Sequence, residues 1–156
     1  MQASIKKIIL ATDFSDTSKD AGYHALFLAQ TYKAELKALH VFDTSAWNVP
    51  SNYYLAPAGP GGFSGFVEGF EEARQRGKDA LTELAKSFDM EVETIFTEGD
   101  PGHEIVRVAE EINADLIVLG THGYSGWKRF AIGSVAELVV RHAPCAVLTI
   151  KPKMRK

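Results

Sequence analysis

The sequence ADLIVLGTHGYSGWKRFAIGS occupies Ala114–Ser134 and combines the signals of a strand, a glycine loop and a helix start. Residues 117–119 form a continuous apolar run, which predicts a buried strand. Gly120 and Gly123 follow this run, and Gly133 precedes the next amphipathic segment. Glycines let a backbone approach an anion closely, and a helix start offers unpaired N–H groups at the positive end of a dipole. The stretch therefore predicts a pocket that holds the phosphates of a nucleotide.

Length and charge narrow the class of protein. The 156 residues favour one domain, and contents of 46% hydrophobic and 24% charged residues are ordinary for a globular protein. The net charge is −3, from 17 basic and 20 acidic residues, whereas a protein that binds nucleic acid usually presents a basic surface. Nucleic acid is therefore not expected as a partner. We expect one domain over residues 1–151 and a solvated basic tail over residues 152–156.

Cysteine content and N-terminal hydropathy bear on the compartment. Cys145 is the single cysteine of the sequence, so no intrachain disulfide can form, which fits a reducing compartment. The apolar run at residues 8–11 is too short for a signal peptide or a membrane span. We therefore expect a cytoplasmic protein that does not insert into a membrane.

Apolar strands and amphipathic helices alternate along the chain. Strands are predicted over residues 5–11, 35–42, 91–97, 114–119 and 145–150. Helices are predicted from residue 15 or 16 to 32, then over 66–88, from 101 to a stop at 113, and over 134–142. This alternation predicts an α/β fold, a doubly wound parallel sheet with helices on both faces.

The segment from Asp43 to Gly65 is the least regular part of the chain, because prolines and glycines are mixed with aromatic residues. A connection of this length is usually functional or disordered, and its aromatic residues argue against plain disorder. Two interpretations remain open. The aromatic side chains cover a site or a partner surface, or they pack locally over the edge of the sheet.

Doubly wound sheets bind ligands at the carboxyl ends of their strands, where the strand order reverses. If the first and fourth strands are neighbours, the loop after Ala11 meets the loop after Gly120. Asp13 could then accept a hydrogen bond from a ribose hydroxyl or hold a magnesium ion. Ser134 and the last helix suit the phosphates, and the backbone at 40–42 could contact an adenine.

The spacing Gly120-x2-Gly123-x9-Gly133-Ser134 resembles the ATP-binding signature of the universal stress protein family. The resemblance extends over nearly the whole chain. It includes the segments Ala11–Ser15, His40–Val41, Glu98–Pro101, Asp115–Gly123 and Pro144–Leu148.

This resemblance implies a five-stranded sheet in the order 3-2-1-4-5 and ATP bound across the loops after the first and fourth strands. Asp13 would lie on the ribose or metal side, beside Ala11 and Thr12, and Val41 would contact adenine through its backbone. The ribose and phosphates would be lined by Gly120, His122, Gly123, Gly133, Ser134 and Val135. Many relatives have proline where this chain has Ala11, and we expect that departure to have little effect on binding.

Several of these residues also have an alternative explanation that is purely structural. Gly120 and Gly123 could be simple turn glycines, and Gly133–Ser134 could be only a helix N-cap. Asp13 could cap the first helix, and His122 could be an ordinary exposed histidine. The histidines and Cys145 show no metal-ligand spacing, so no metal site is predicted except Mg²⁺ bound together with ATP at Asp13.

Catalysis has little support in the sequence. The Gly-Lys-Ser/Thr element of Walker nucleotide-binding loops is absent, and so is the nucleophile elbow of hydrolases, so no catalytic residue is assigned. The leading hypothesis is an ATP-binding stress-response or regulatory protein whose nucleotide state is read by an unidentified protein partner. The alternatives are a slow ATPase or phosphotransfer enzyme, and an interaction module that works without nucleotide.

The last strand, Cys145–Ile150, is predicted at a sheet edge, where an apolar strand invites pairing. The family resemblance implies that two copies pair through this strand. We therefore expect a homodimer.

Overall fold

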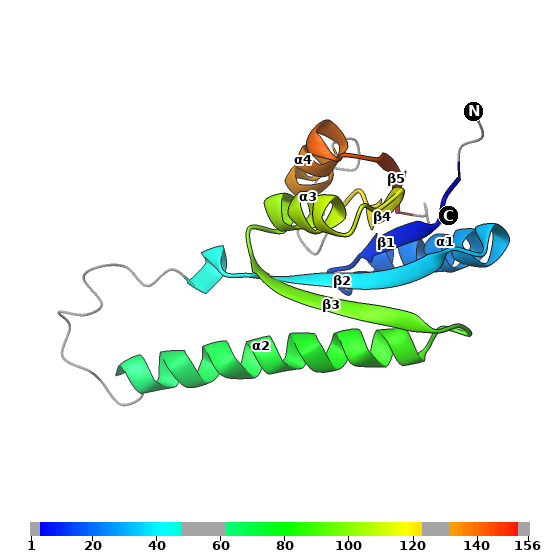
Figure 1. The fold of residues 1–156 in the computed structure, drawn as a ribbon. Coiled ribbons are helices and arrows are strands. Elements are labelled where there is room, and N and C mark those ends of the chain that lie inside the picture. The colour runs from blue at the N-terminus through cyan, green and yellow to red at the C-terminus, as the bar shows by residue number, and fades with distance from the viewer. Residues whose placement is uncertain (1–3, 48–61, 123–131, 153–156) are drawn as a thin grey trace.

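Five parallel strands form a single sheet in the order β3-β2-β1-β4-β5 (Figure 1). The computed structural model describes residues 4–47, 62–122 and 132–152. The strands are β1 (Lys7–Ala11), β2 (Glu35–Asp43), β3 (Val92–Gly99), β4 (Leu116–Gly120) and β5 (Ala146–Ile150). The predicted fold class and strand order are therefore confirmed.

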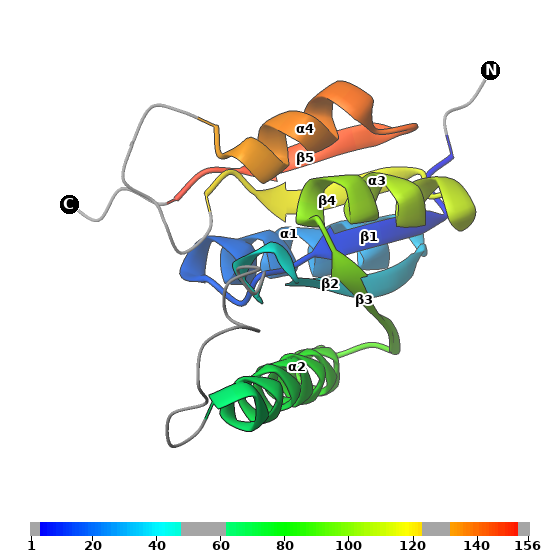
Figure 2. The ribbon, with the colours of Figure 1, turned by 90° about the vertical axis from the view of Figure 1, so that its left-hand side faces the viewer.

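Helices cover both faces of this sheet. They are α1 (Asp16–Tyr32), α2 (Gly62–Lys86), α3 (Pro101–Glu111) and α4 (Ser134–His142), with a short 3₁₀ helix, η1, at Ser45–Trp47. Figures 1 and 2 show α1 and α2 on one face and α3 and α4 on the other. None of the helices in the described ranges is long and apolar enough to span a bilayer.

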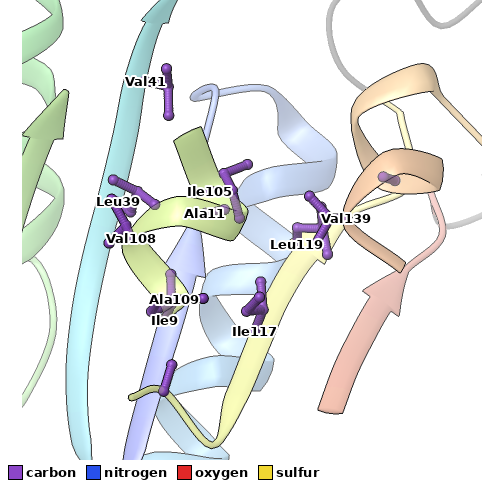
Figure 3. Packing of buried hydrophobic residues seen from close by; sticks show 12 residues of the cluster. Ile9, Ala11, Leu39, Val41, Ile105, Val108, Ala109, Ile117, Leu119 and Val139 are labelled. Carbon is purple, nitrogen blue, oxygen red and sulfur yellow. The ribbon is translucent and has the colours of Figure 1, made fainter. Parts of the chain in front are cut away.

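Two layers of core explain why the central strands have continuous apolar runs. On one face Ile9 and Ile117 pack with residues of α3 and α4, as Figure 3 shows. On the other face Ile8 and Val118 pack with the alanines of α1. Both faces of β1 and β4 are therefore removed from water, which requires apolar residues at successive positions.

The start of α2 is the largest difference from the predicted elements. The helix begins at Gly62 rather than at residue 66, whereas the other predicted ends lie within two residues of the observed ones. Trp47 of η1 makes edge contacts with Phe66 and Phe70, at ring distances of 5.7 and 5.4 Å. This tertiary packing favours helix in a glycine-rich stretch whose intrinsic helix propensity is low. For Trp47, local packing is thus the correct interpretation, while residues 48–61 lie outside the described ranges.

Asp115 joins the amino ends of the two central strands. Its Oδ2 atom accepts hydrogen bonds from the backbone N–H groups of Lys6 at 2.7 Å and Lys7 at 2.9 Å. These two bonds hold the pKa of the Asp115 carboxyl below its usual value. The contact fixes β1 against β4, and the opposite ends of these strands flank the candidate site.

Candidate functional site

The strand order reverses at β1. This strand pairs with β2 on one side and with β4 on the other, and Ala11 lies in register with Leu39 and Leu119. The expectation that the first and fourth strands are neighbours is confirmed. The loops that follow β1 and β4 therefore leave the sheet side by side at its carboxyl edge, which is where ligands bind in this fold class.

Thr12 anchors the β1 loop, and its polar groups are held inside the protein. Its N–H donates to the Leu39 carbonyl at 2.9 Å. Its hydroxyl donates to Ser18 Oγ at 3.1 Å and accepts from the Phe14 N–H at 3.0 Å. The residue is buried, so these bonds satisfy groups that would otherwise lose hydration. The backbone entering Asp13 is therefore fixed in place.

Asp13 is exposed at the edge of the sheet. Its Oδ1 atom accepts from the Ser15 N–H at 3.0 Å, which forms a tight turn into α1. Ser15, not Asp13, is the N-cap of α1, because its side chain accepts from the Ser18 N–H. The interpretation of Asp13 as the helix cap is thus wrong. The turn holds an exposed carboxylate at the point where a ribose hydroxyl or a hydrated cation could reach it.

The side chain of His40 braces the same loop from β2. Its Nδ1 atom lies 2.8 Å from the Thr12 carbonyl oxygen, which can only accept, so Nδ1 carries the proton. Burial lowers the pKa of His40, against the opposing effects of the Thr12 carbonyl and the Asp13 charge. The ring is therefore neutral near neutral pH. Sequence reasoning placed His40 at a strand end but assigned nothing to its side chain.

Gly120 brings the end of β4 against α1. A Cβ atom at this position would lie 2.9 Å from Thr17 Cγ2 and 3.3 Å from the Thr17 backbone carbon. The next residue, Thr121, is buried, and its N–H donates to the Ile150 carbonyl at 2.9 Å. Glycine is therefore required at position 120 so that the end of β4 can pack closely against α1. Gly120 is more than a simple turn glycine.

His122 is half-buried rather than an ordinary exposed histidine. Its Nδ1 atom lies 2.8 Å from Thr121 Oγ1. This contact orients the imidazole at the point where the loop leaves β4. Gly123, the next predicted site residue, lies outside the described ranges.

Gly133 returns the chain to the end of β4. Its N–H donates to the Thr121 carbonyl at 2.7 Å, and a Cβ atom on Gly133 would lie only 2.9 Å from the same oxygen. The base of the loop is thus closed by a backbone contact that leaves no space for a side chain. This contact places the amino terminus of α4 directly at the carboxyl end of β4.

Within the described residues, no side chain caps the amino terminus of α4. Gly133 is the N-cap, without a side-chain hydrogen bond, and Ser134 is the first helical residue. The first bond of the helix ladder runs from the Glu137 N–H to the Gly133 carbonyl, so the preceding N–H groups have no partner within the helix. Of the pair Gly133–Ser134 that could be an N-cap, Gly133 is thus the N-cap, and Ser134 lies inside the helix. Its exposed hydroxyl and these N–H groups suit an anion.

The predicted site residues in the described ranges lie along one edge of the sheet. Figure 3 shows Val41, Ala11 and Leu119 on three neighbouring strands. Val41 is buried in the core cluster that also contains residues of α3, so its side chain is part of that core. Val135 is half-buried in the first turn of α4. In the parts of the chain that the structure describes, no cluster of three acidic, histidine or cysteine side chains could hold a metal by itself.

Comparison with known proteins identifies a family and similar solved structures. Residues 4–151 match the model of the universal stress protein family. A universal stress protein of Methanocaldococcus jannaschii is 36% identical over 146 residues, which is 94% of this chain and 82% of the relative. The solved structure of universal stress protein UspA from Lactobacillus plantarum is 31% identical with a TM-score of 0.75, over 96% of this chain and 99% of that chain. A universal stress protein solved in complex with cAMP is 25% identical with a TM-score of 0.57, over 94% of this chain and 97% of that chain.

Proposed function

Because this chain belongs to the universal stress protein family, we propose that it binds ATP, together with Mg²⁺, across the loops that follow β1 and β4. One observation carries the proposal. The amino terminus of α4, which no side chain in the described ranges caps, is tied to the end of β4, and β4 pairs with β1, whose loop presents Asp13. The positive end of the helix dipole suits phosphates, and the exposed carboxylate beside it suits sugar hydroxyls, so the pair fits a ligand that has both. The relative solved in complex with cAMP supports an adenine nucleotide.

Each part of the nucleotide has a group of this chain to meet. The N–H groups of Ser134 and Val135, with the Ser134 hydroxyl, would receive the phosphates. Asp13 would bind a ribose hydroxyl or the hydrated Mg²⁺. The backbone of Val41 would face the adenine. Ala11, Thr12, Gly120, His122 and Gly133 would form the walls between them, and Gly123 stays a prediction.

In this proposal the protein retains its nucleotide and does not hydrolyse it rapidly. Fast phosphoryl transfer needs groups that orient the attacking nucleophile and stabilise the transition-state charge. In the proposed site Asp13, which accepts a hydrogen bond from the Ser15 backbone, would lie on the ribose side rather than beside the phosphates. A bound nucleotide would instead fix the loops at this edge in one shape, which a regulatory partner could recognise.

Nucleotide binding can be tested with purified protein. We expect that acid treatment releases ATP or ADP, or that stripped protein binds the fluorescent analogue mant-ATP in the presence of Mg²⁺. Unlabelled ATP should displace mant-ATP, and chelation of Mg²⁺ should weaken binding. A phosphate-release assay then separates retention from turnover. Protein that releases no nucleotide and binds no mant-ATP at millimolar Mg²⁺ would refute the proposal.

We also propose that two copies of this chain pair through β5, the edge strand of the sheet. The Ile150 carbonyl accepts from the Thr121 N–H, so the peptide groups of Ile150 face β4. Backbone groups alternate in direction along a strand, and those of Thr149 therefore point away from the sheet. They are available to a second edge strand.

The dimer gives a second testable prediction. Light scattering at tens of micromolar should show a dimer for the natural chain and a monomer for Thr149→Pro, because proline removes an outward N–H group without touching the bonds to β4. The matched variant Thr149→Val keeps the N–H group and should remain dimeric. A monomeric natural chain, or a dimeric proline variant, would contradict pairing through β5.

A further inference from the structure

His40 lies where the candidate site, the sheet and α2 meet. Leu39 and Val41, its neighbours in β2, belong to the core cluster beneath α3 and α4. Side chains alternate along a strand, so His40 points to the opposite face. There its ring lies against α2, since a Cβ on Gly77 would be 3.3 Å from both His40 Cδ2 and His40 Nε2. Phe96 of β3 flanks it, with ring centroids 5.9 Å apart.

Among the described residues, the polar contact of the His40 ring is with the β1 loop. His40 Nδ1–H donates to the Thr12 carbonyl at 2.8 Å, while the Thr12 N–H donates to the Leu39 carbonyl. Both backbone groups of Thr12 are therefore bonded to β2. The N–H bond continues the pairing of the strands, but the carbonyl bond depends on a side chain. A substitution at His40 that removes the donor would release the peptide that leads directly into Asp13.

The loop beyond Thr12 needs this support. Phe14 has a φ angle of 65°, a left-handed conformation that a bulky residue rarely adopts and that costs free energy. Its ring packs on His40 with centroids 4.5 Å apart. The same imidazole therefore holds the loop at two points, the Thr12 carbonyl before Asp13 and the Phe14 ring after it.

From these contacts we infer that His40 is a positioning residue of the nucleotide site, which holds Asp13 in place through the hydrogen bond from Nδ1 to the Thr12 carbonyl. The inference rests on the nucleotide-binding function proposed above. In this inference the His40 side chain acts through the loop and not by contact with the nucleotide. Its contribution is to keep the carboxylate of Asp13 preorganised, so that binding does not have to order the loop.

Two amide substitutions separate the hydrogen bond from packing. In His40→Asn the side-chain amide nitrogen occupies the place of Nδ1 and can donate to the Thr12 carbonyl. In His40→Gln the same amide lies one carbon further from the backbone, toward Gly77. Both variants lose the aromatic ring. A difference in binding between them therefore reports on the hydrogen bond to the Thr12 carbonyl alone. His24→Gln, at an exposed position of α1, serves as the matched control.

We expect His40→Gln to bind mant-ATP about fivefold to tenfold more weakly than His40→Asn, the difference that one hydrogen bond typically makes. His24→Gln should bind as the natural chain does. Hydrogen exchange, measured without nucleotide, should show faster exchange of the Phe14 and Ser15 amides in His40→Gln than in His40→Asn. Equal affinities, or equal exchange rates in the loop, would overturn the inference. A natural chain that binds no nucleotide refutes the proposed function instead, and the exchange measurement still decides whether His40 holds the loop.

Discussion

Gly133→Val should weaken mant-ATP binding by at least about tenfold, because it displaces the helix start that is proposed to hold the phosphates. Any Cβ at this position would lie 2.9 Å from the Thr121 carbonyl oxygen. That oxygen belongs to the backbone at the end of β4 and already accepts from the Gly133 N–H at 2.7 Å. No flexible side chain can move aside to relieve the contact. The amino terminus of α4 must therefore shift away from the sheet.

The backbone conformation of Gly133 makes this test specific. Its φ of −64° and ψ of 153° are open to any residue, so valine introduces a steric contact but no dihedral strain. Gly65→Ala is the matched control, because nothing lies within 4 Å of a Cβ at Gly65. The control should bind mant-ATP like the natural chain. If Gly133→Val folds, by circular dichroism, and still binds with natural affinity, the phosphates are not held at the start of α4.

The architecture could be predicted from the sequence because its signals are local. The continuous apolar runs at residues 8–11 and 117–119 mark strands that are buried on both faces, and those runs became β1 and β4. Ser15 and Asp100 mark helix starts, and both accept N-cap hydrogen bonds. Each of these signals is contained within a few neighbouring residues, so no tertiary information is needed to interpret it.

The parts that were missed depend on contacts between distant residues. The low helix propensity of glycine opposes a helix start at Gly62. Helix α2 nevertheless begins there because Trp47 packs on its first turns. The spacing of glycines pointed to Gly120 and Gly133, but the reason for glycine at each position is a contact with Thr17 or Thr121. No local pattern reveals such contacts.

His40 illustrates the same limit within the candidate site. Its bond to the Thr12 carbonyl crosses from β2 to the β1 loop, between residues 28 apart in the chain. In the sequence it is one histidine within a strand, and nothing nearby marks its partner. The space for its ring exists because residue 77 of α2, which is still more distant in the sequence, is a glycine. Positioning residues of this kind become visible only when the strand order is known.

Ile117→Ala should destabilise the fold by about 2–5 kcal/mol, the usual range for truncating a fully buried isoleucine. Ile117 is 0% exposed, in the middle of β4. It belongs to the core cluster that joins β1 and β4 to α3 and α4 (Figure 3). Removal of its side chain leaves a cavity that rigid strands on either side cannot close, so a transfer cost and a cavity cost add together.

Val147→Ala provides the matched control, because Val147 is the register partner of Ile117 on the edge strand β5. Val147 is only partly buried, and truncation there should cost about 1 kcal/mol. Urea unfolding followed by circular dichroism measures both variants, at one protein concentration and after bound nucleotide has been stripped. Stripping is necessary because a ligand that binds only the folded state adds stability according to its own affinity. Equal losses at the two positions would mean that the packing around β4 relaxes as easily as the packing at the sheet edge, which contradicts a rigid central strand beneath the site.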